Sequence, residues 1–532
     1  MLRVNQLNMA PGRGEEKIRE KLLQTFHLET EELLEWHIFK RSIDARKKPE
    51  VFYSYTIDFS TKNERKLLQK YKGRLRPAAR TDYQAPECQE RFLPSRPIIV
   101  GAGPAGLFSA YLLAMAGCRP IVLERGAAVE ERVRDVEKFW EEGVFNPSSN
   151  VQFGEGGAGT FSDGKLNTMV KERHGRNRFV LESFVKFGAP ESILYEQKPH
   201  MGTDVLVDVV RNMRNEIIRL GGEVRFHSQV TDLEITGSRK KSINAVIING
   251  CEKMYTRILI LAIGHSARDT FRLLHRRGIP MESKAFAVGV RVEHPQKMIQ
   301  VAQYGDKMAG RLPPASYKLT HSLENGRGVY TFCMCPGGYV VNASSEEGRL
   351  AVNGMSYSNR NGENANSAVI VTVTPDDYGA HGPLSGIEFQ QRLEERAYEL
   401  GGKKIPVQRF DDFCANRPTT KLGDVLPQMK GAYRLANVRS IFAEELAGSL
   451  QEGILAMDKK IHGFARPDAV LSGVESRTSS PVRVLRDENM ESGVEGVYPC
   501  GEGAGYAGGI TSAAMDGMKV AEAILRADSR AT

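Results

Sequence analysis

The apolar and polar positions are most sharply patterned where the main body of the chain begins. A short apolar strand at 97–100 leads into an apolar helical stretch at 107–116 and a second strand at 120–123. This order predicts a βαβ unit. The 22 residues from Pro97 to Cys118 carry no charge and could cross a bilayer. Because the segment contains GAGPAG near its start, we expect a nucleotide-binding turn and not a membrane span.

Residues 1–80 follow a different pattern, which predicts a separate small α+β domain. Residues at helical spacing are followed by residues that alternate as in a half-buried strand. The helical set is Ile18, Leu22, Leu23 and Phe26, and the alternating set is Val51, Tyr53, Tyr55, Ile57 and Phe59. The stretch 81–95 contains two prolines and is expected to be a linker.

The remaining pattern predicts one domain interrupted by another. Residues 96–275 and 486–532 are expected to form the two parts of a Rossmann-like domain. Residues 276–485 combine strand-like runs with one clear helix at 386–400, and we expect an inserted α+β domain on the substrate side. The predicted fold class is therefore α/β, with the inserted domain and the small N-terminal domain added.

Composition and cysteine content narrow the class of protein. The 532 residues are 41% hydrophobic and 26% charged, which is typical of a soluble globular protein and excludes disorder, collagen and a multi-span membrane protein. Seven cysteines are an odd number and too sparse for a disulfide scaffold. The first thirty residues lack the pattern of a secretory signal, so we expect a cytoplasmic protein without a membrane partner.

Much of the net charge of +8 falls in one segment. Residues 61–80 contain eight Lys or Arg residues and a single acid, Glu64. Such a run is usually a solvated face, and its poor interleaving with aromatic residues weakens the case for RNA. A nucleic acid bound through 61–80 stays open as an alternative.

The strongest chemical signal is GAGPAG followed by an acid after the next strand. Gly101 permits a tight turn, Gly103 lets a pyrophosphate approach the backbone, and Gly106 allows close helix packing. Glu124, 18 residues after Gly106, can accept hydrogen bonds from ribose hydroxyls. The pattern predicts dinucleotide binding by Gly101, Gly103, Pro104, Ala105, Gly106, Glu124 and Arg125.

Two distant segments, one at 259–264 and one at 496–511, point to FAD as the dinucleotide. A strand at 496–499 enters a glycine cluster, and a helix is expected after Gly509. This arrangement resembles flavoproteins of the glutathione-reductase superfamily, in which a carboxylate here reaches the ribityl chain and a helix N-terminus faces the flavin. Glu502 departs from the Asp that is usual there. Together with Val230, the residues of these segments expected at FAD are Gly264, Gly501, Glu502, Gly509, Ile510 and Thr511.

A further glycine cluster and two cysteines are the remaining candidates for the redox site. The run FGEGGAGTFSDGKL at 153–166 is expected to form a mobile loop facing the flavin through Gly156 and Gly157, with Lys165 reaching substrate or cofactor; plain loop architecture is the alternative. Cys333 and Cys335 are expected on an extended strand, on one face, where a disulfide between them would be strained. At most one of them should act on a flavin; the alternative is that both are simply buried apolar groups.

Other kinds of site find little support. No His or Cys pair has the spacing of a zinc site or of a C-x-x-C redox pair, so no metal is predicted. GHSAR at 264–268 almost matches a nucleophile elbow, but Arg268 stands where that turn needs glycine. His265 is one of several candidate proton donors, and Arg477 could bind an anion or cap a turn.

These motifs together resemble a family of bacterial proteins described as uncharacterised FAD-dependent, or NAD(FAD)-utilising, dehydrogenases. The resemblance covers the chain after about residue 90 and implies a glutathione-reductase-type FAD domain. We expect an FAD-dependent oxidoreductase that transfers a hydride between flavin and a small organic substrate. No second Rossmann unit is evident, so NADH or NADPH would dock only transiently. A flavin-dependent RNA-modifying enzyme and a non-catalytic flavin-binding protein are the alternatives.

Overall fold

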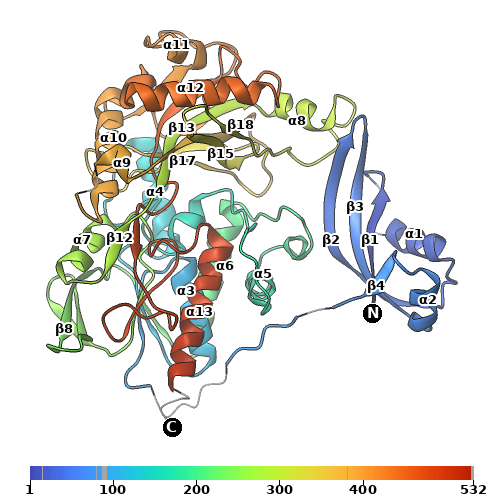
Figure 1. The fold of residues 1–532 in the computed structure, drawn as a ribbon, viewed down its shortest axis with the longest axis horizontal. Helices are drawn as coiled ribbons and strands as arrows, with labels where there is room; N and C mark the ends of the chain where they lie inside the picture. The colour runs from blue at the N-terminus through green and yellow to red at the C-terminus, as the bar shows by residue number, and fades with distance from the viewer. Residues whose placement is uncertain (13, 15, 80, 87–92, 380, 529–532) are drawn as a thin grey trace.

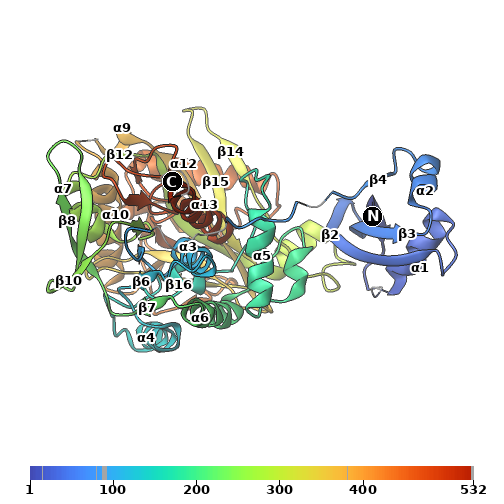
Figure 2. The ribbon, with the colours of Figure 1, turned by 90° about the horizontal axis from the view of Figure 1, so that it is seen from below.

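The computed structural model describes residues 1–528 except 13, 15, 80, 87–92 and 380. A small N-terminal unit is joined to a larger body by an extended segment, as Figures 1 and 2 show from two directions. Part of the predicted linker and Arg80 of the basic run lie outside the described residues.

The N-terminal unit is an antiparallel sheet of order β2-β3-β1-β4 with two helices. Its strands are β1 (Leu2–Met9), β2 (Leu33–Lys47), β3 (Glu50–Thr61) and β4 (Leu75–Pro77), and its helices are α1 (Glu16–Phe26) and α2 (Glu64–Lys70). Ile18, Leu22 and Phe26 of α1 pack with Ile57 and Phe59 of β3 in one core. The two predicted apolar patterns therefore face each other.

Strand β2 carries the contacts between this unit and the body. The Arg41 amide donates to the Tyr195 carbonyl at 2.7 Å, and the Gln197 amide donates to the Arg41 carbonyl at 2.8 Å. The Arg41 guanidinium also pairs with Glu196. Lys48, the first residue after β2, donates to the Ala302 carbonyl. The unit is thus held by backbone pairing as well as by charge.

A five-stranded parallel sheet of order β24-β11-β5-β6-β7 lies at the centre of the body. The strands are β5 (Ile98–Val100), β6 (Ile121–Leu123), β7 (Glu223–Arg225), β11 (Leu259–Leu261) and β24 (Val497–Pro499). Strand β24 comes from the last tenth of the chain and pairs with β11, which pairs with β5. The C-terminal segment therefore returns to the sheet that the first βαβ unit begins.

Alternate side chains of the short parallel strands enter two different cores. Ile99, Val122 and Ile260 pack with helices on one face, whereas Ile98 and Leu259 pack with an antiparallel sheet on the other. The helices are α3 (Pro104–Met115), α6 (Thr203–Arg219) and α13 (Ile510–Asp528); the antiparallel strands are β8 (Val230–Thr236), β9 (Ser242–Ile248) and β10 (Glu252–Tyr255).

Helix α3 accounts for the long uncharged stretch in the sequence. Its residues from 105 to 114 are all buried, because the helix is enclosed by the sheet and by α6 and α13. Among the described residues, no helix combines the length and apolarity that a membrane span requires.

A seven-stranded sheet of order β14-β15-β18-β13-β22-β19-β21 forms the second layer of the body. The strands are β13 (Phe286–Pro295), β14 (Thr320–Ser322), β15 (Gly328–Cys335), β18 (Asn364–Val373), β19 (Ile405–Arg409), β21 (Tyr433–Leu435) and β22 (Val470–Glu475). The chain enters through β12 (Met281–Ser283) and leaves through β23 (Val482–Val484), which pair antiparallel. A further small sheet contains β16 (Tyr339–Asn342), β17 (Val352–Met355) and β20 (Met429–Lys430).

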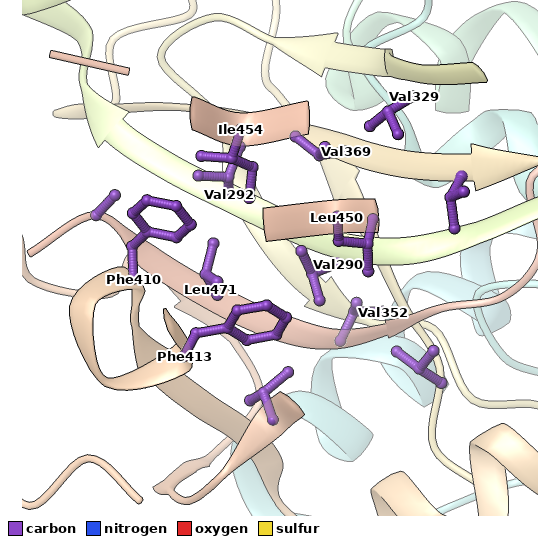
Figure 3. Packing of buried hydrophobic residues seen from close by; sticks show 14 of the residues in the cluster. Val290, Val292, Val329, Val352, Val369, Phe410, Phe413, Leu450, Ile454 and Leu471 are labelled. Carbon is purple, nitrogen blue, oxygen red and sulfur yellow. The ribbon is translucent and has the colours of Figure 1, made fainter. Parts of the chain in front are cut away.

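The two faces of the seven-stranded sheet differ in character. Val290, Val292 and Val369 lie under Leu450 and Ile454 of α12 (Glu444–Asp458), in the packing drawn in Figure 3. The opposite face carries buried polar residues instead, among them Arg291, Asn366 and Glu475. One face of this sheet therefore builds a core, and the other is suited to a site.

The remaining helices connect and cover these layers. They are α4 (Val129–Glu142), α5 (Arg176–Lys186), α7 (Arg268–Arg276), α8 (Gln296–Tyr304), α9 (Pro375–Tyr378), α10 (Ser385–Gly401), α11 (Phe410–Cys414) and the short 3₁₀ helices η1 (Gly157–Phe161), η2 (Glu191–Leu194) and η3 (Val438–Ile441).

Candidate cofactor pocket

A cavity of about 690 Å³ opens at the carboxyl ends of β5, β11 and β24. In parallel sheets of this kind, ligands bind at that edge. The cavity is lined by Gly101 after β5, by Gly264 after β11 and by Glu502 after β24. The seven-stranded domain lines it with Phe332, Cys333, Asn353, Glu475 and Arg477.

The three glycines of the turn after β5 have different surroundings. At Gly101, φ is +102° and a Cβ would lie 2.4 Å from the Ala262 carbonyl oxygen, so only glycine fits. At Gly106 a Cβ would lie 1.9 Å from the Gly101 oxygen, and this glycine does not line the cavity. At Gly103 the nearest atom to a Cβ is the Gly157 Cα, at 3.9 Å. The backbone at Gly103 is therefore open to the cavity, with no side chain covering it.

Two helices begin at the cavity. Pro104 and Ala105 of α3 line it, as do Gly509 and Ile510 at the start of α13. First-turn N–H groups have no partner within their helix, and the N-terminal end of the helix dipole favours negative charge. Together with the open backbone at Gly103, these ends fit the phosphates and the electron-rich edge of FAD.

Two predicted residues of the C-terminal cluster face away from the cavity. Gly501 has φ +74°, and a Cβ there would lie 2.7 Å from the Ala105 Cβ, so this glycine brings the two turns together. The Thr511 hydroxyl donates to the Leu166 carbonyl at 2.9 Å. Both residues shape the wall without lining it.

Glu124 braces the cavity wall with its carboxylate. Its oxygens accept from the amides of Ala102 at 2.8 Å, Gly126 at 2.9 Å and Gly154 at 3.0 Å. A carboxylate has about four lone-pair sites, so capacity for a ribose hydroxyl remains. Glu124 also lines the cavity.

Arg125 and Val230 line the same part of the pocket as Glu124. The Arg125 guanidinium lies 4.4 Å from the centre of the Phe153 ring and donates to Asp269 at 2.9 Å. Stacking on Phe153 and the ion pair with Asp269 hold the guanidinium in place. The guanidinium and the ring can then border a planar ligand group such as an adenine.

The glycine-rich loop is held more firmly than the sequence predicts. Buried Arg132 donates to three carbonyls of the loop, those of Gly154, Glu155 and Gly157, and to two just before it, those of Asn150 and Val151. Gly157 lines the cavity, whereas Gly156 lies beside Thr160 on the far side. These hydrogen bonds to a buried arginine oppose the mobility that the glycines of the loop would allow.

Lys165 lies in a buried group of charges beside the cavity. Its Nζ is 3.4 Å from Asp163 Oδ2, and Arg360 Nε donates to Asp163 Oδ1 at 3.0 Å. Although burial opposes it, Lys165 and Arg360 hold the pKa of Asp163 below its ordinary value. The Lys165 nitrogen is itself buried and makes no hydrogen bond within the described residues. It is therefore available to an acceptor in the cavity.

The expected regular strand at the two cysteines is wrong. The ladder between β15 and β18 shifts register between Phe332 and Cys335, and Cys333 has φ +44°. Cys333 lines the cavity, but Cys335 is fully buried behind it and does not. The bulge turns one of the two thiols toward the pocket, which is a common effect of bulges next to sites.

Two polar groups of the pocket have no motif in the sequence. Glu475 and Asn353 line the cavity and come from two separate segments, whereas Gln152 and Asp163 lie beside and within the glycine-rich run. Burial raises the pKa of Glu475 to about 7, against the pull of Arg291. Only the topology of the two sheets brings these residues together, so sequence spacing gives no signal for them.

Two residues with open roles in the sequence acquire defined contacts. His265 Nδ1 lies 3.5 Å from Glu502 Oε1, and both residues line the cavity. Arg477 pairs with buried Glu394 at 2.8 Å and donates to Ser266 at 3.3 Å. Arg477 is therefore part of a buried ion pair, its hydrogen bond to Ser266 links that pair to the segment after β11, and it also lines the pocket.

Family comparisons agree with this site in defining an FAD-dependent class. Residues 96–135 match the model of an FAD binding domain, and residues 285–478 match an FAD-dependent protein, C-terminal domain-like. Residues 1–60 match a domain of unknown function.

A protein similar to this chain over nearly its whole length shows the family to which it belongs. An uncharacterized protein of Clostridium beijerinckii is 46% identical over 537 residues, covering 98% of this chain and 98% of that protein. The chain belongs to the same family of FAD-dependent proteins.

Solved structures show weaker likeness. Quinol fumarate reductase FrdA of E. coli is 10% identical, with 82% of this chain and 71% of that chain covered and a TM-score of 0.38. L-proline dehydrogenase of P. horikoshii is 12% identical, with 83% and 95% covered and a TM-score of 0.32. Likeness at this level carries no information about the reaction.

Proposed function

We propose that this protein is an FAD-dependent oxidoreductase, with a glutathione-reductase-type FAD domain, that transfers a hydride between flavin and an organic substrate. The supporting observation is the composition of one cavity. Its walls combine two helix N-termini and the open backbone at Gly103 with Lys165, Cys333 and Glu475 from the opposite side. Bound FAD would supply the hydride-transfer chemistry, which protein side chains lack.

The chain's own residues would bind and orient. The first turns of α3 and α13 favour negative charge, Glu124 offers acceptors to hydroxyls, and Arg125 borders a planar ring. On the substrate side, the Lys165 ammonium can hold an acceptor group, and Glu475 can give or take a proton near neutral pH because its pKa lies near 7.

An anaerobic titration of the FAD-loaded protein tests the redox role. NADH and NADPH are added in turn, and the flavin absorption band is followed. We expect one of them to bleach the band, by docking transiently at the open cavity. A flavin that no hydride donor reduces would instead favour the non-catalytic alternative.

A flavin-dependent RNA-modifying enzyme is the second candidate, and one observation favours it. All seven lysines and arginines described between 62 and 76 are exposed, on α2 and beside β4. Lys66→Gln combined with Lys70→Gln and Arg74→Gln should weaken RNA binding and its salt dependence if this face holds phosphates. RNA binding that the triple variant leaves unchanged would remove this candidate.

We also propose a cytoplasmic location. Within the described residues, the cysteines at 251, 333, 335, 414 and 500 form no disulfide, as expected in a reducing compartment. Fractionation of cells followed by detection of the protein tests this point; recovery outside the cytoplasm would contradict it.

A further inference from the structure

The bulge in β15 brings two cysteines together beside the cavity wall. The Cys335 thiol donates to the Cys333 carbonyl oxygen at 3.3 Å, so it lies against the backbone of Cys333. In a regular strand, residues i and i+2 stand about 6.6 Å apart with parallel side chains, which opposes a disulfide. Cys333 leaves that geometry with its left-handed φ, so the objection drawn from a regular strand does not apply.

Positive groups surround this thiol pair. Arg291 Nη2 donates to the Cys333 carbonyl at 2.8 Å and lies 3.6 Å from Cys335 Sγ. The neighbouring Cys335 thiol, together with Lys165 and Arg291, lowers the pKa of Cys333, although burial opposes this shift. The same coupling raises the pKa of Cys335. A thiolate is the reactive form of cysteine. Cys333 is therefore suited to be the nucleophile, and Cys335 to be the resolving cysteine.

The position of the pair is as informative as its charge. Cys333 lines the cavity that the two glycine turns also line, whereas Cys335 is 0% exposed. Of the other described cysteines, Cys500 also lines the cavity but is buried, whereas exposed Cys251 and half-buried Cys414 do not border it. One thiol facing a pocket with a second thiol behind it is the arrangement that a dithiol–disulfide couple requires.

We propose that Cys333 and Cys335 form a redox-active pair that exchanges two electrons with the flavin, and that the substrate class is a disulfide. The inference rests on the proposed function, because the electrons reach the pair from FAD reduced by a hydride donor such as a nicotinamide. Cys333 is the catalytic residue that attacks the substrate, and Cys335 completes the exchange.

The electrons and atoms balance over three steps. The Cys333–Cys335 disulfide would take up two electrons, which bound reduced FAD would supply, and two protons, and would become two thiols. The Cys333 thiolate then attacks one sulfur of the substrate R–S–S–R, whose S–S bond breaks, and one thiolate leaves. Cys335 attacks the Cys333 sulfur, its proton passes to the second departing sulfur, and the internal disulfide re-forms as two R–SH are released.

Counting electrons and thiols tests the pair without measuring turnover. The FAD-loaded protein is oxidised with diamide, freed of reagent and titrated anaerobically with dithionite. We expect four electrons per flavin in the wild type and two in Cys333→Ser and in Cys335→Ser. The control Cys251→Ser, which removes an exposed thiol, should keep four. In denaturant, the oxidised wild type should show two fewer reactive thiols than the reduced wild type.

Each outcome bears on a different claim. A wild type that retains all its thiols after oxidation and takes two electrons per flavin would overturn the redox pair while leaving the flavoprotein intact. Loss of two thiols in Cys333→Ser would show that other cysteines pair, and would also overturn it. A preparation that binds no FAD is recognised from its absorption spectrum. That result would contradict the proposed function, and with it the proposed electron exchange between the flavin and the cysteine pair.

Discussion

Single glycines decide how closely a ligand can approach this chain. Gly103 has ordinary helical-entry backbone angles and open space beyond it, whereas Gly106 is enclosed by the Gly101 carbonyl. Gly103→Val should therefore leave the fold intact and place its branched side chain in the cavity. We expect FAD affinity to fall at least about 100-fold, or about 2.7 kcal/mol, measured by quenching of flavin fluorescence.

The matched variant at Gly106 separates these effects. Gly106→Ala should lower the melting temperature of the protein, because its methyl group would overlap the Gly101 oxygen. Full flavin retention by Gly103→Val would contradict the position that we give to the phosphates.

Glu293 is a buried carboxyl with a clear pH signature. Its Oε1 accepts from Asn364 at 3.0 Å and from the Gln428 amide at 2.8 Å, and burial raises its pKa to about 7. Between about pH 4.5 and 7 the folded state holds a proton that the unfolded state has lost, so stability falls as pH rises through this range. Glu293→Gln removes that contribution.

Urea unfolding at pH 5 and pH 8 measures this effect. The stability of Glu293→Gln relative to the wild type should rise by up to about 3 kcal/mol between the two pH values, at 1.36 kcal/mol for each pKa unit. The control Glu388→Gln, at an exposed position of α10, should follow the wild type. A parallel course for Glu293→Gln and wild type would show that this carboxyl ionises normally.

At the scale of elements, the best-predicted features are those with a complete local signal. The βαβ unit at 97–123 has its strand, glycine turn and helix in one continuous stretch, and the structure has β5, α3 and β6 there. The helix expected after Gly509 begins at Ile510. In contrast, the bulge at Cys333 depends on pairing with β18, some thirty residues later, so an extended pattern could not predict it.

Helix α12 provides a direct test of the core of the seven-stranded sheet. Ile454 is fully buried against that sheet, whereas its neighbour Leu455 is 47% exposed. Ile454→Ala should cost about 2–5 kcal/mol of stability by leaving a cavity, and Leu455→Ala less than about 0.5 kcal/mol. Urea denaturation compares the two; equal costs would mean that α12 does not pack as described.

Within the whole molecule, a buried charge network fixes the two large domains relative to each other. Arg268 of α7 pairs with Glu394 of α10 at 2.7 Å, and Arg477 pairs with the same carboxylate at 2.8 Å. The network explains why Arg268 stands in GHSAR, where the nucleophile elbow would need glycine. Its partner lies 126 residues away, so the sequence shows the departure from the motif without its cause.

The site as a whole was predictable only in part, for the same reason. Segments near 101, 264 and 502 carry motifs, and their turns line one cavity. Asn353 and Glu475 reach that cavity only through the pairing of strands across the inserted domain, and no spacing along the chain encodes it.

The most direct test of the account is the flavin content of the purified chain after incubation with FAD and removal of excess cofactor. The account predicts one FAD per chain, identified by its absorption spectrum and by the mass of the molecule released on denaturation. A colourless protein that retains no FAD would contradict the claim that three distant segments enclose a single dinucleotide.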